Sequence, residues 1–292
     1  MGRIIIAGDL LPSRNNVSLF ENGNALALFG EKILQIFKDA DYSIINLEGP
    51  LTEATIQQDK VKPILKSSIQ SIRGIKSLGV TSVALANNHI TDYLQQGYDD
   101  TVSTLDANGI RYLGAGPRES EIKKYESVFV GNKKVCIYNV SETFFNLPGK
   151  NSAGVNLYDE YVVCNDIKKL KETHDYLIVL YHGGAERCAY PTPIVRRRFH
   201  RMADSGADFI TAQHTHCIGC EEHYKHSYLL FGQGNFLFDR MSMPMARKGL
   251  VTEIDIVEND FIIIHHLVKV TKQGTIEYDD KQDLSDFYNR IK

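Results

Sequence analysis

Three things are scarce in this sequence of 292 residues: long hydrophobic runs, charge of one sign, and cysteine. No apolar run approaches the roughly 20 residues that a membrane-spanning helix needs. The net charge is only −3, which gives no electrostatic footprint for nucleic acid. The chain enters an apolar segment almost at once, which leaves no room for a signal peptide. We therefore expect a cytoplasmic protein with no membrane span and no nucleic-acid partner.

The five cysteines are an odd number spread over a long chain, which favours reduced thiols over a disulfide framework. Cys217 and Cys220 form a lone C-x-x-C pair. This pair could be half of a zinc or redox site, but one pair supplies too few soft ligands. The less specific interpretation, ordinary thiols, is therefore favoured.

Hydrophobic periodicity indicates alternating strands and helices in the first part of the chain. Strands are expected at 4–7, 42–46, 80–85 and 111–113, with helices at 26–40, 67–78 and 95–107 between them. Residues 53–63 are polar and are expected to form a surface loop. This order predicts a parallel or mixed sheet with helices outside.

The rhythm changes after residue 125, where a Gly-Asn turn indicates a hairpin. Further strands are expected at 127–130, 134–140, 176–181, 208–211 and 227–231, helices at 158–173 and 192–205, and a late hairpin at 249–257 and 261–270. No linker interrupts the chain, so residues 1–292 are predicted to form a single domain.

Polar side chains follow five of these strands at their carboxyl ends, where ligands bind in open α/β sheets. They are Asp9, Glu48, Asn88-His89, His182 and His214-x-His216. Each alone has a simpler explanation as a helix cap or an exposed histidine. Side chains alternate along an extended segment, so His214 and His216 are expected on one side of it. Together, carboxylate, amide and imidazole ligands suit manganese, iron or zinc.

Seven motifs carry a family resemblance when they are taken in order. They are GDLLPSR, NLEGPLT, ANNHITD, GAG, HGGAE, QHTHC and FGQGNFLF. From about Ile4 to Phe238 the chain resembles the CapA/PgsA-type poly-γ-glutamate and capsule biosynthesis proteins of the calcineurin-like metallophosphoesterase superfamily. The resemblance implies a four-layer α/β/β/α sandwich with mixed sheets, completed by a C-terminal hairpin and helix at 249–292. It also implies two divalent metal ions at the strand ends.

The resemblance also implies roles for individual residues. Asp9 and His216 would bind one ion, and Asn88, His182 and His214 the other, with Glu48 as the bridge. His89 resembles the general acid that protonates a leaving group. Arg14, Asn87, Glu186 and Asn235 are added as candidate substrate contacts, although Arg14 is equally compatible with a structural salt bridge.

Several positions depart from the family pattern. Leu11 stands where the broader superfamily has a histidine ligand, and Glu48 where many phosphoesterases have aspartate. Gly183 stands where CapA-like proteins usually have tryptophan, which opens space near His182. A helical arginine cluster follows (Arg196, Arg197, Arg198 and Arg201), and only one or two of its members can face a crevice.

The resulting hypothesis is a metal-dependent, phosphoesterase-like hydrolase in capsule, polysaccharide or poly-γ-glutamate biosynthesis. Its substrate would be an anionic small molecule or polymer, and it could work within a biosynthetic complex. One alternative is a non-hydrolytic component of a polymer synthase. Another is amide or ester chemistry on a γ-glutamyl substrate, because one fold hosts several chemistries.

Overall fold

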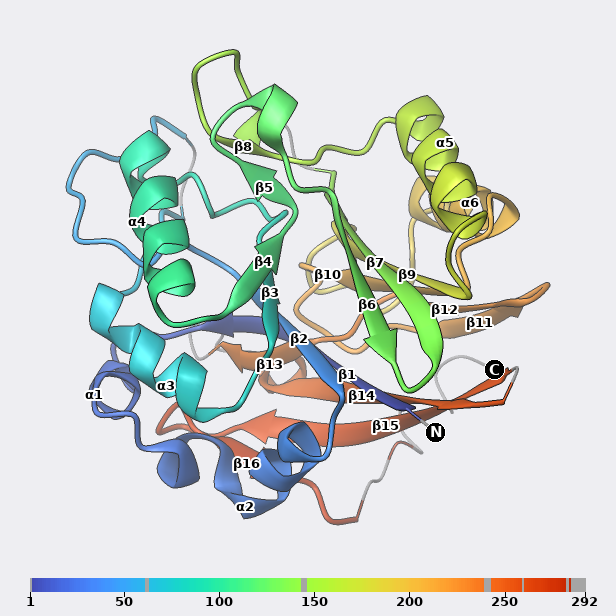
Figure 1. The fold of residues 1–292 in the computed structure, drawn as a ribbon. Coiled ribbons are helices and arrows are strands. Elements are labelled where there is room, and N and C mark those ends of the chain that lie inside the picture. Colours follow the sequence, from blue (N-terminus) through green and yellow to red (C-terminus); the bar gives the residue numbers. More distant parts are fainter. Residues whose placement is uncertain are drawn as a thin grey trace.

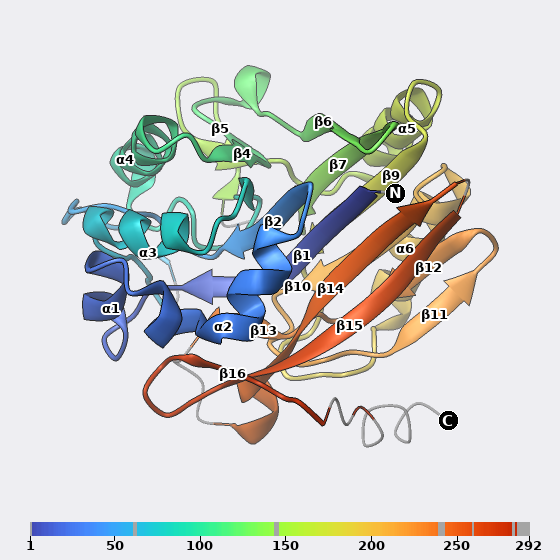
Figure 2. The ribbon, with the colours of Figure 1, turned by 60° about the horizontal axis from the view of Figure 1, so that its bottom comes forward.

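Two β-sheets face each other, and helices cover both outer faces (Figures 1 and 2). This computed structural model describes residues 2–60, 63–142, 146–238, 243–258, 260–281 and 284. Helices α1 to α4 lie on one side and α5 and α6 on the other. The predicted four-layer sandwich with mixed sheets is therefore confirmed.

The first sheet has the order β16-β15-β14-β1-β2-β3-β4, and β13 also pairs with β1. Its strands from β1 to β4 are mutually parallel, whereas β14, β15 and β16 are antiparallel to their neighbours. The bounds are β1 Gly2–Leu11, β2 Tyr42–Leu47, β3 Ser82–Ala84, β4 Arg111–Leu113, β13 Asn235–Phe238, β14 Lys248–Val257, β15 Asp260–Val270 and β16 Ile276–Tyr278. The late hairpin is thus β14–β15, and the helix expected after it falls mostly outside the described residues.

The second sheet has the order β11-β12-β10-β9-β7-β6, and a small separate pair joins β5 to β8. The bounds are β5 Ala115–Gly116, β6 Tyr125–Val130, β7 Lys133–Ser141, β8 Gly154–Val155, β9 Tyr176–His182, β10 Phe209–Gln213, β11 Glu221–Tyr224 and β12 Ser227–Leu230. Strands β7, β9, β10 and β12 run parallel, so their carboxyl ends share one edge of the sheet.

Helices α2, α4, α5 and α6 begin and end close to the ranges expected from periodicity, whereas α1 is not expected from the sequence and the helix expected at 67–78 is divided into η1 and α3. The bounds are α1 Val17–Glu21, α2 Ala25–Lys38, α3 Ile72–Ser77, α4 Leu94–Ala107, α5 Glu160–Lys171 and α6 Pro193–Asp204, with short 3-10 turns η1 Ile69–Ser71, η2 Glu119–Glu121 and η4 Pro244–Arg247. Asp159 and Thr192 cap α5 and α6 by accepting from the backbone N–H groups of Val162 and Val195. Within the described residues, none of the helices combines the length and hydropathy required to cross a bilayer.

The apolar run at the start of β1 is continuous because both faces of this strand are buried. Ile4 and Ile6 pack into the core between the two sheets, whereas Ile5 and Ala7 pack under α1 to α4. A third core lies between the second sheet and helices α5 and α6. This packing fixes the two sheets against each other and so determines which strand ends meet.

Candidate metal centre

Two carboxylates form the part of the site that the first sheet supplies. Asp9 lies near the end of β1, and Glu48 follows the last residue of β2; both are fully buried. The register pairs Asp9 with Asn46 of β2, whose amide donates to Asp9 Oδ1 at 2.8 Å. The backbone N–H of His214 donates to Asp9 Oδ2 at 3.1 Å, which ties the two sheets together at this edge.

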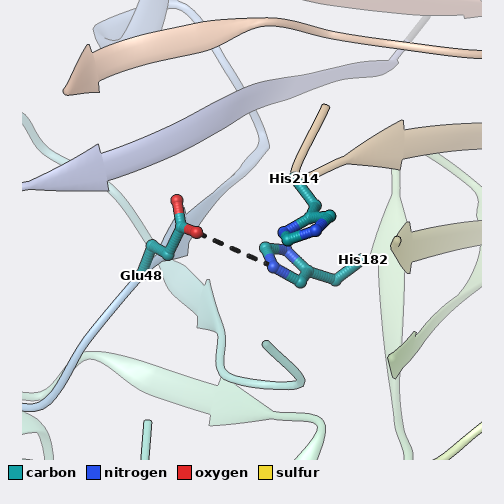
Figure 3. A group of neighbouring side chains, drawn as sticks. All are labelled: Glu48, His182 and His214. Atoms are coloured by element: carbon teal, nitrogen blue, oxygen red, sulfur yellow. Dashed lines mark ion pairs between the residues drawn. The ribbon is translucent and has the colours of Figure 1, made fainter. Parts of the chain in front are cut away.

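Three imidazoles come from the second sheet. His182 is the last residue of β9, and His214 and His216 follow the end of β10. His182 Nε2 lies 3.8 Å and His216 Nε2 lies 4.0 Å from Glu48 Oε1. The ring of His214 is 4.9 Å from that of His182, measured between centroids. Figure 3 shows the carboxylate of Glu48 facing His182, with His214 beside it.

The expectation that His214 and His216 share one side of an extended segment is wrong. The backbone turns at both residues, with φ values of +91° and +53°. Such values are uncommon for residues with a side chain and are held only when surrounding contacts compensate. Here the turn directs both rings into the site, where their centroids are 6.0 Å apart.

The side chains fit a cation because they leave buried oxygen atoms without a partner. Both carboxylate oxygens of Glu48 and Nδ1 of His214 are buried and form no hydrogen bond among the described residues. A buried, unsatisfied carboxylate costs free energy unless a cation compensates it. Ligand atoms of Asp9, Glu48 and His216 lie within 4.8 Å of one another, as do those of Glu48, His182 and His214. The two groups share Glu48, as a bridging carboxylate requires.

The ionisation of these groups indicates the same need for positive charge. Burial raises the pKa of Glu48 well above its usual range, and the nearby Asp9 carboxylate raises it further. Burial opposes a proton on His216, but Glu48 and Asp9 outweigh it and raise the pKa of His216 to about 10. Burial lowers the pKa values of His182 and His214. Without a metal, a proton on His216 therefore supplies the charge that a cation would otherwise bring.

Three amide side chains surround the cluster. Asn88 Oδ1 lies 3.0 Å from His182 Nε2, so this oxygen points toward the second group of ligands. Asn46 contacts both Asp9 and His182, the latter at 3.3 Å from Nδ1. Asn235 Oδ1 accepts from His216 Nδ1 at 2.8 Å and fixes the orientation of that ring. The sequence predicts a substrate contact for Asn235, but in the structure its fully buried amide also donates to the carbonyl of Ala246.

The sequence analysis does not identify Asn46 as a residue of the site, although it contacts two of the candidate ligands. The available signal was its position two residues before Glu48, which places both on one face of an extended segment.

His89 lies beside the cluster in a hydrogen-bonded network of its own. Its Nδ1 lies 2.7 Å from Asp92 Oδ2, and Asp92 also forms an ion pair with Lys60. Lys60 Nζ donates to the backbone carbonyl of Asn88 at 2.7 Å. The lysine side chain is only 4% exposed, so the prediction of a polar surface loop over 53–63 is wrong at this residue. Lys60 is buried because the charge of the buried Asp92 side chain needs a counter-charge.

Asn87, another candidate substrate contact, holds the backbone of the loop that carries His89. Its side chain is fully buried. The side-chain oxygen of Asn87 accepts from the backbone N–H groups of His89 and Ile90, and its amide donates to Asn46 and to the carbonyl of Leu47. This geometry gives Asn87 a positioning role and leaves it no surface for a ligand.

The remaining candidates lie at the rim or elsewhere. Glu186 is exposed, with Oε1 4.0 Å from His214 Nε2. Arg14 is exposed, forms no ion pair among the described residues, and lines a small surface pocket that contains none of the candidate ligands. Leu11 packs against Leu65 and Phe238, so apolar contacts replace a ligand there.

The cysteines do not add ligands to the centre. Cys217 and Cys220 are buried free thiols. Across the residues that the structure describes, no cysteine belongs to a candidate metal group.

Solved structures share this architecture. A phosphatase from Mycoplasma pneumoniae aligns with a TM-score of 0.53 at 15% identity, covering 99% of each chain. A 5'-nucleotidase precursor from Thermus thermophilus aligns with a TM-score of 0.51 at 12% identity, covering 99% of this chain and 58% of that one. At this level of identity the similarity establishes the fold, which is that of the metallophosphoesterase-like proteins.

The sequence identifies the family more closely. Residues 3–240 match the family described as bacterial capsule synthesis protein PGA_cap, and the chain belongs to it. It is 30% identical over 238 residues to the PGA biosynthesis protein CapA of Bacillus subtilis strain 168, covering 80% of this chain and 62% of that protein. It is 27% identical over 244 residues to the capsule biosynthesis protein CapA of Bacillus anthracis, covering 80% of this chain and 59% of the relative. The chain thus spans about three fifths of the length of these curated relatives.

Proposed function

We propose that this protein is a metal-dependent hydrolase of the phosphoesterase type. It acts on an anionic small molecule or polymer during the synthesis of capsule, polysaccharide or poly-γ-glutamate. The observation that carries the proposal is Glu48, a fully buried carboxylate with no hydrogen-bond partner among the described residues and with imidazoles of His182 and His216 within 4.0 Å. Removing a charge from water in this way is costly unless a cation occupies the centre.

The side chains divide into two sets of ligands. Asp9 and His216 would hold one divalent ion, and His182, His214 and Asn88 the other, with Glu48 between them. Carboxylate, imidazole and amide donors favour manganese, iron or zinc over calcium. When bound, such a pair of ions polarises the phosphoryl oxygens and makes water a stronger nucleophile.

We infer that His89 handles the proton of the departing group. Its Nδ1 is used by Asp92, so the ring is held in one orientation and Nε2 remains to hold or donate a proton. Burial lowers the pKa of His89, an effect that Asp92 partly opposes. Asn235 orients the ring of His216 as Asp92 orients that of His89, through the hydrogen bond that its amide oxygen accepts from Nδ1.

Replacing Glu48 with Gln tests the metal centre directly. This variant keeps the size of the side chain but removes the charge that both sets of ligands share. We expect wild-type protein purified without chelators to hold up to two divalent ions by elemental analysis, and Glu48→Gln to lose at least half of that content. Glu121→Gln is the matched control, because Glu121 is exposed and its side chain pairs with Arg118 alone among the described residues. Equal metal content in wild type and Glu48→Gln would contradict the proposal.

A second function, that of a non-hydrolytic component of a biosynthetic complex, is favoured by the relatives. Two are named for PGA or capsule biosynthesis, and a protein of Mycobacterium tuberculosis is named as a probable polyglutamine synthesis accessory protein. A panel of phosphomonoesters, phosphodiesters and γ-glutamyl amides separates the candidates. Turnover of a phosphoester supports the first function, and turnover of an amide alone supports amide chemistry. Metal-loaded protein that turns over none of them supports the accessory role.

A further inference from the structure

A cavity of about 630 Å³ opens beside the candidate metal centre. His182 and His214 form one of its walls, so the cavity and the centre are continuous. Ala185, Ile194 and Val195 add apolar surface. A substrate whose reacting group lies at the metal centre would therefore extend its remaining part over this surface.

Arg198 of α6 is the one permanently charged cation among the described residues that line the cavity. Its Nη1 donates to Glu142 Oε2 at 2.5 Å and lies 2.6 Å from the hydroxyl oxygen of Tyr181. Its guanidinium carbon lies 4.8 Å from the centre of the Tyr158 ring. These contacts hold the guanidinium plane in place, while a quarter of the side chain remains exposed.

The other edge of this guanidinium, formed by Nε and Nη2, has no partner among the residues that the structure describes. In Arg3 and Arg196 the edge formed by Nε and Nη2 binds a carboxylate through two bonds of 2.7 to 3.0 Å, to Asp255 and Glu222. In Arg198, Glu142 binds through Nη1 alone. The edge formed by Nε and Nη2 forms no hydrogen bond with any described residue. The two parallel N–H donors of this edge match the two oxygens of a carboxylate or phosphate, which is the preferred geometry for bidentate binding.

Both carboxylate oxygens of Glu142 already accept hydrogen bonds from the protein. Its Oε1 accepts from the backbone N–H of Gly184 at 2.9 Å, and its Oε2 accepts from Tyr181 and Arg198. A Cβ atom at Gly183 would lie 2.5 Å from Glu142 Cγ. Glycine at position 183 therefore allows Glu142 to fix Arg198 and keeps the cavity open.

We propose that this cavity is a subsite for a second oxyanion of the substrate, a carboxylate or a phosphate carried on a short apolar stem. Arg198 is its specificity-determining residue. The assignment rests on the proposed function, in that the first anionic group of the substrate lies at the metal centre. It gives the arginine-rich helix a role that its sequence alone left open.

Three ligands that share a phosphonate end test the subsite. Propylphosphonate ends in a methyl group, carboxyethylphosphonate in a carboxylate, and propylene bisphosphonate in a second phosphonate. Each is titrated by calorimetry into Mn²⁺-loaded wild type, Arg198→Lys, Arg198→Met and the control Arg196→Met, after a titration with Mn²⁺ alone. Arg198→Lys keeps a positive charge beside Glu142, so we expect this variant to fold normally. Its ammonium group has no pair of parallel N–H donors for bidentate binding.

We expect wild type and Arg196→Met to bind at least one of the two ligands that carry a second anionic group about tenfold more tightly than propylphosphonate. The ligand that gains shows whether carboxylate or phosphate is preferred. This advantage should disappear in Arg198→Met and fall severalfold in Arg198→Lys. Equal affinities in wild type, or an advantage that persists in both Arg198 variants, would overturn the subsite while leaving the metal centre intact. Failure of the Mn²⁺ titration itself would instead overturn the proposed function.

Discussion

At the scale of single residues, two buried carboxylates, Asp92 and Glu48, have different environments. Lys60 and Asp92 neutralise each other in an ion pair, and Asp92 also accepts from the backbone N–H of Leu65. Neither carboxylate oxygen of Glu48 forms a hydrogen bond among the described residues, and its ion-pair partners are the imidazoles of His182 at 3.8 Å and His216 at 4.0 Å, which are themselves candidate metal ligands. Because an unpaired buried charge costs several kcal/mol, a protein keeps one only where something compensates it. This contrast distinguishes a structural ion pair from a binding centre.

The role of His89 can be separated from metal binding by one substitution. His89→Ala removes the imidazole that Asp92 orients but none of the candidate metal ligands. With Mn²⁺ present, we expect phosphodiester turnover to fall by about a hundredfold or more, the usual contribution of a general acid. Metal content by elemental analysis should remain nearly that of wild type. Unchanged turnover would remove His89 from the chemistry, and loss of metal would make it a ligand instead.

At the scale of elements, the site depends on contacts between strand ends that belong to different sheets. Asn139 of β7 shows how these ends are joined. Its side-chain oxygen accepts from the backbone N–H of Ala86, just beyond β3, at 2.8 Å. Its amide donates to the carbonyl of Leu180 in β9 at 3.1 Å. One buried amide thus joins the loop that carries Asn88 to the strand that ends in His182.

Replacing Asn139 with Ala should therefore destabilise the protein. The substitution leaves the buried backbone N–H of Ala86 without the Asn139 acceptor and removes the bond to the carbonyl of Leu180, at a cost of about 2 kcal/mol. Urea unfolding measures this as a lower midpoint. The control Asn132→Ala changes an exposed residue at the turn between β6 and β7 and should shift the free energy of unfolding by less than about 0.5 kcal/mol. Equal stabilities of the two variants would show that the Asn139 hydrogen bonds contribute little.

At the scale of the whole molecule, strand boundaries can be predicted from the sequence, whereas contacts that depend on the packing of the two sheets cannot. Asp9, Glu48 and His182 were recognisable because each follows an apolar run of strand length, and such a boundary is local. The partners of these residues are not local. Burial of Lys60 and the turn at His214 both result from packing of one segment against another, which periodicity does not encode. The orientation of amides such as Asn46 depends on the same packing.

Because both sheets contribute ligands, metal binding should stabilise the entire fold. An ion that binds only the folded state at a hundred times its dissociation constant adds about 2.7 kcal/mol to the free energy of unfolding. For a chain of 292 residues that corresponds to a rise in Tm of about 4 °C. Scanning calorimetry of metal-free protein with and without Mn²⁺ measures the shift, and a chelator should reverse it. Glu48→Gln, which lacks the shared charge, should show a much smaller rise. A Tm that does not respond to Mn²⁺, Fe²⁺ or Zn²⁺ would mean that the carboxylates and imidazoles at this edge do not form a metal centre.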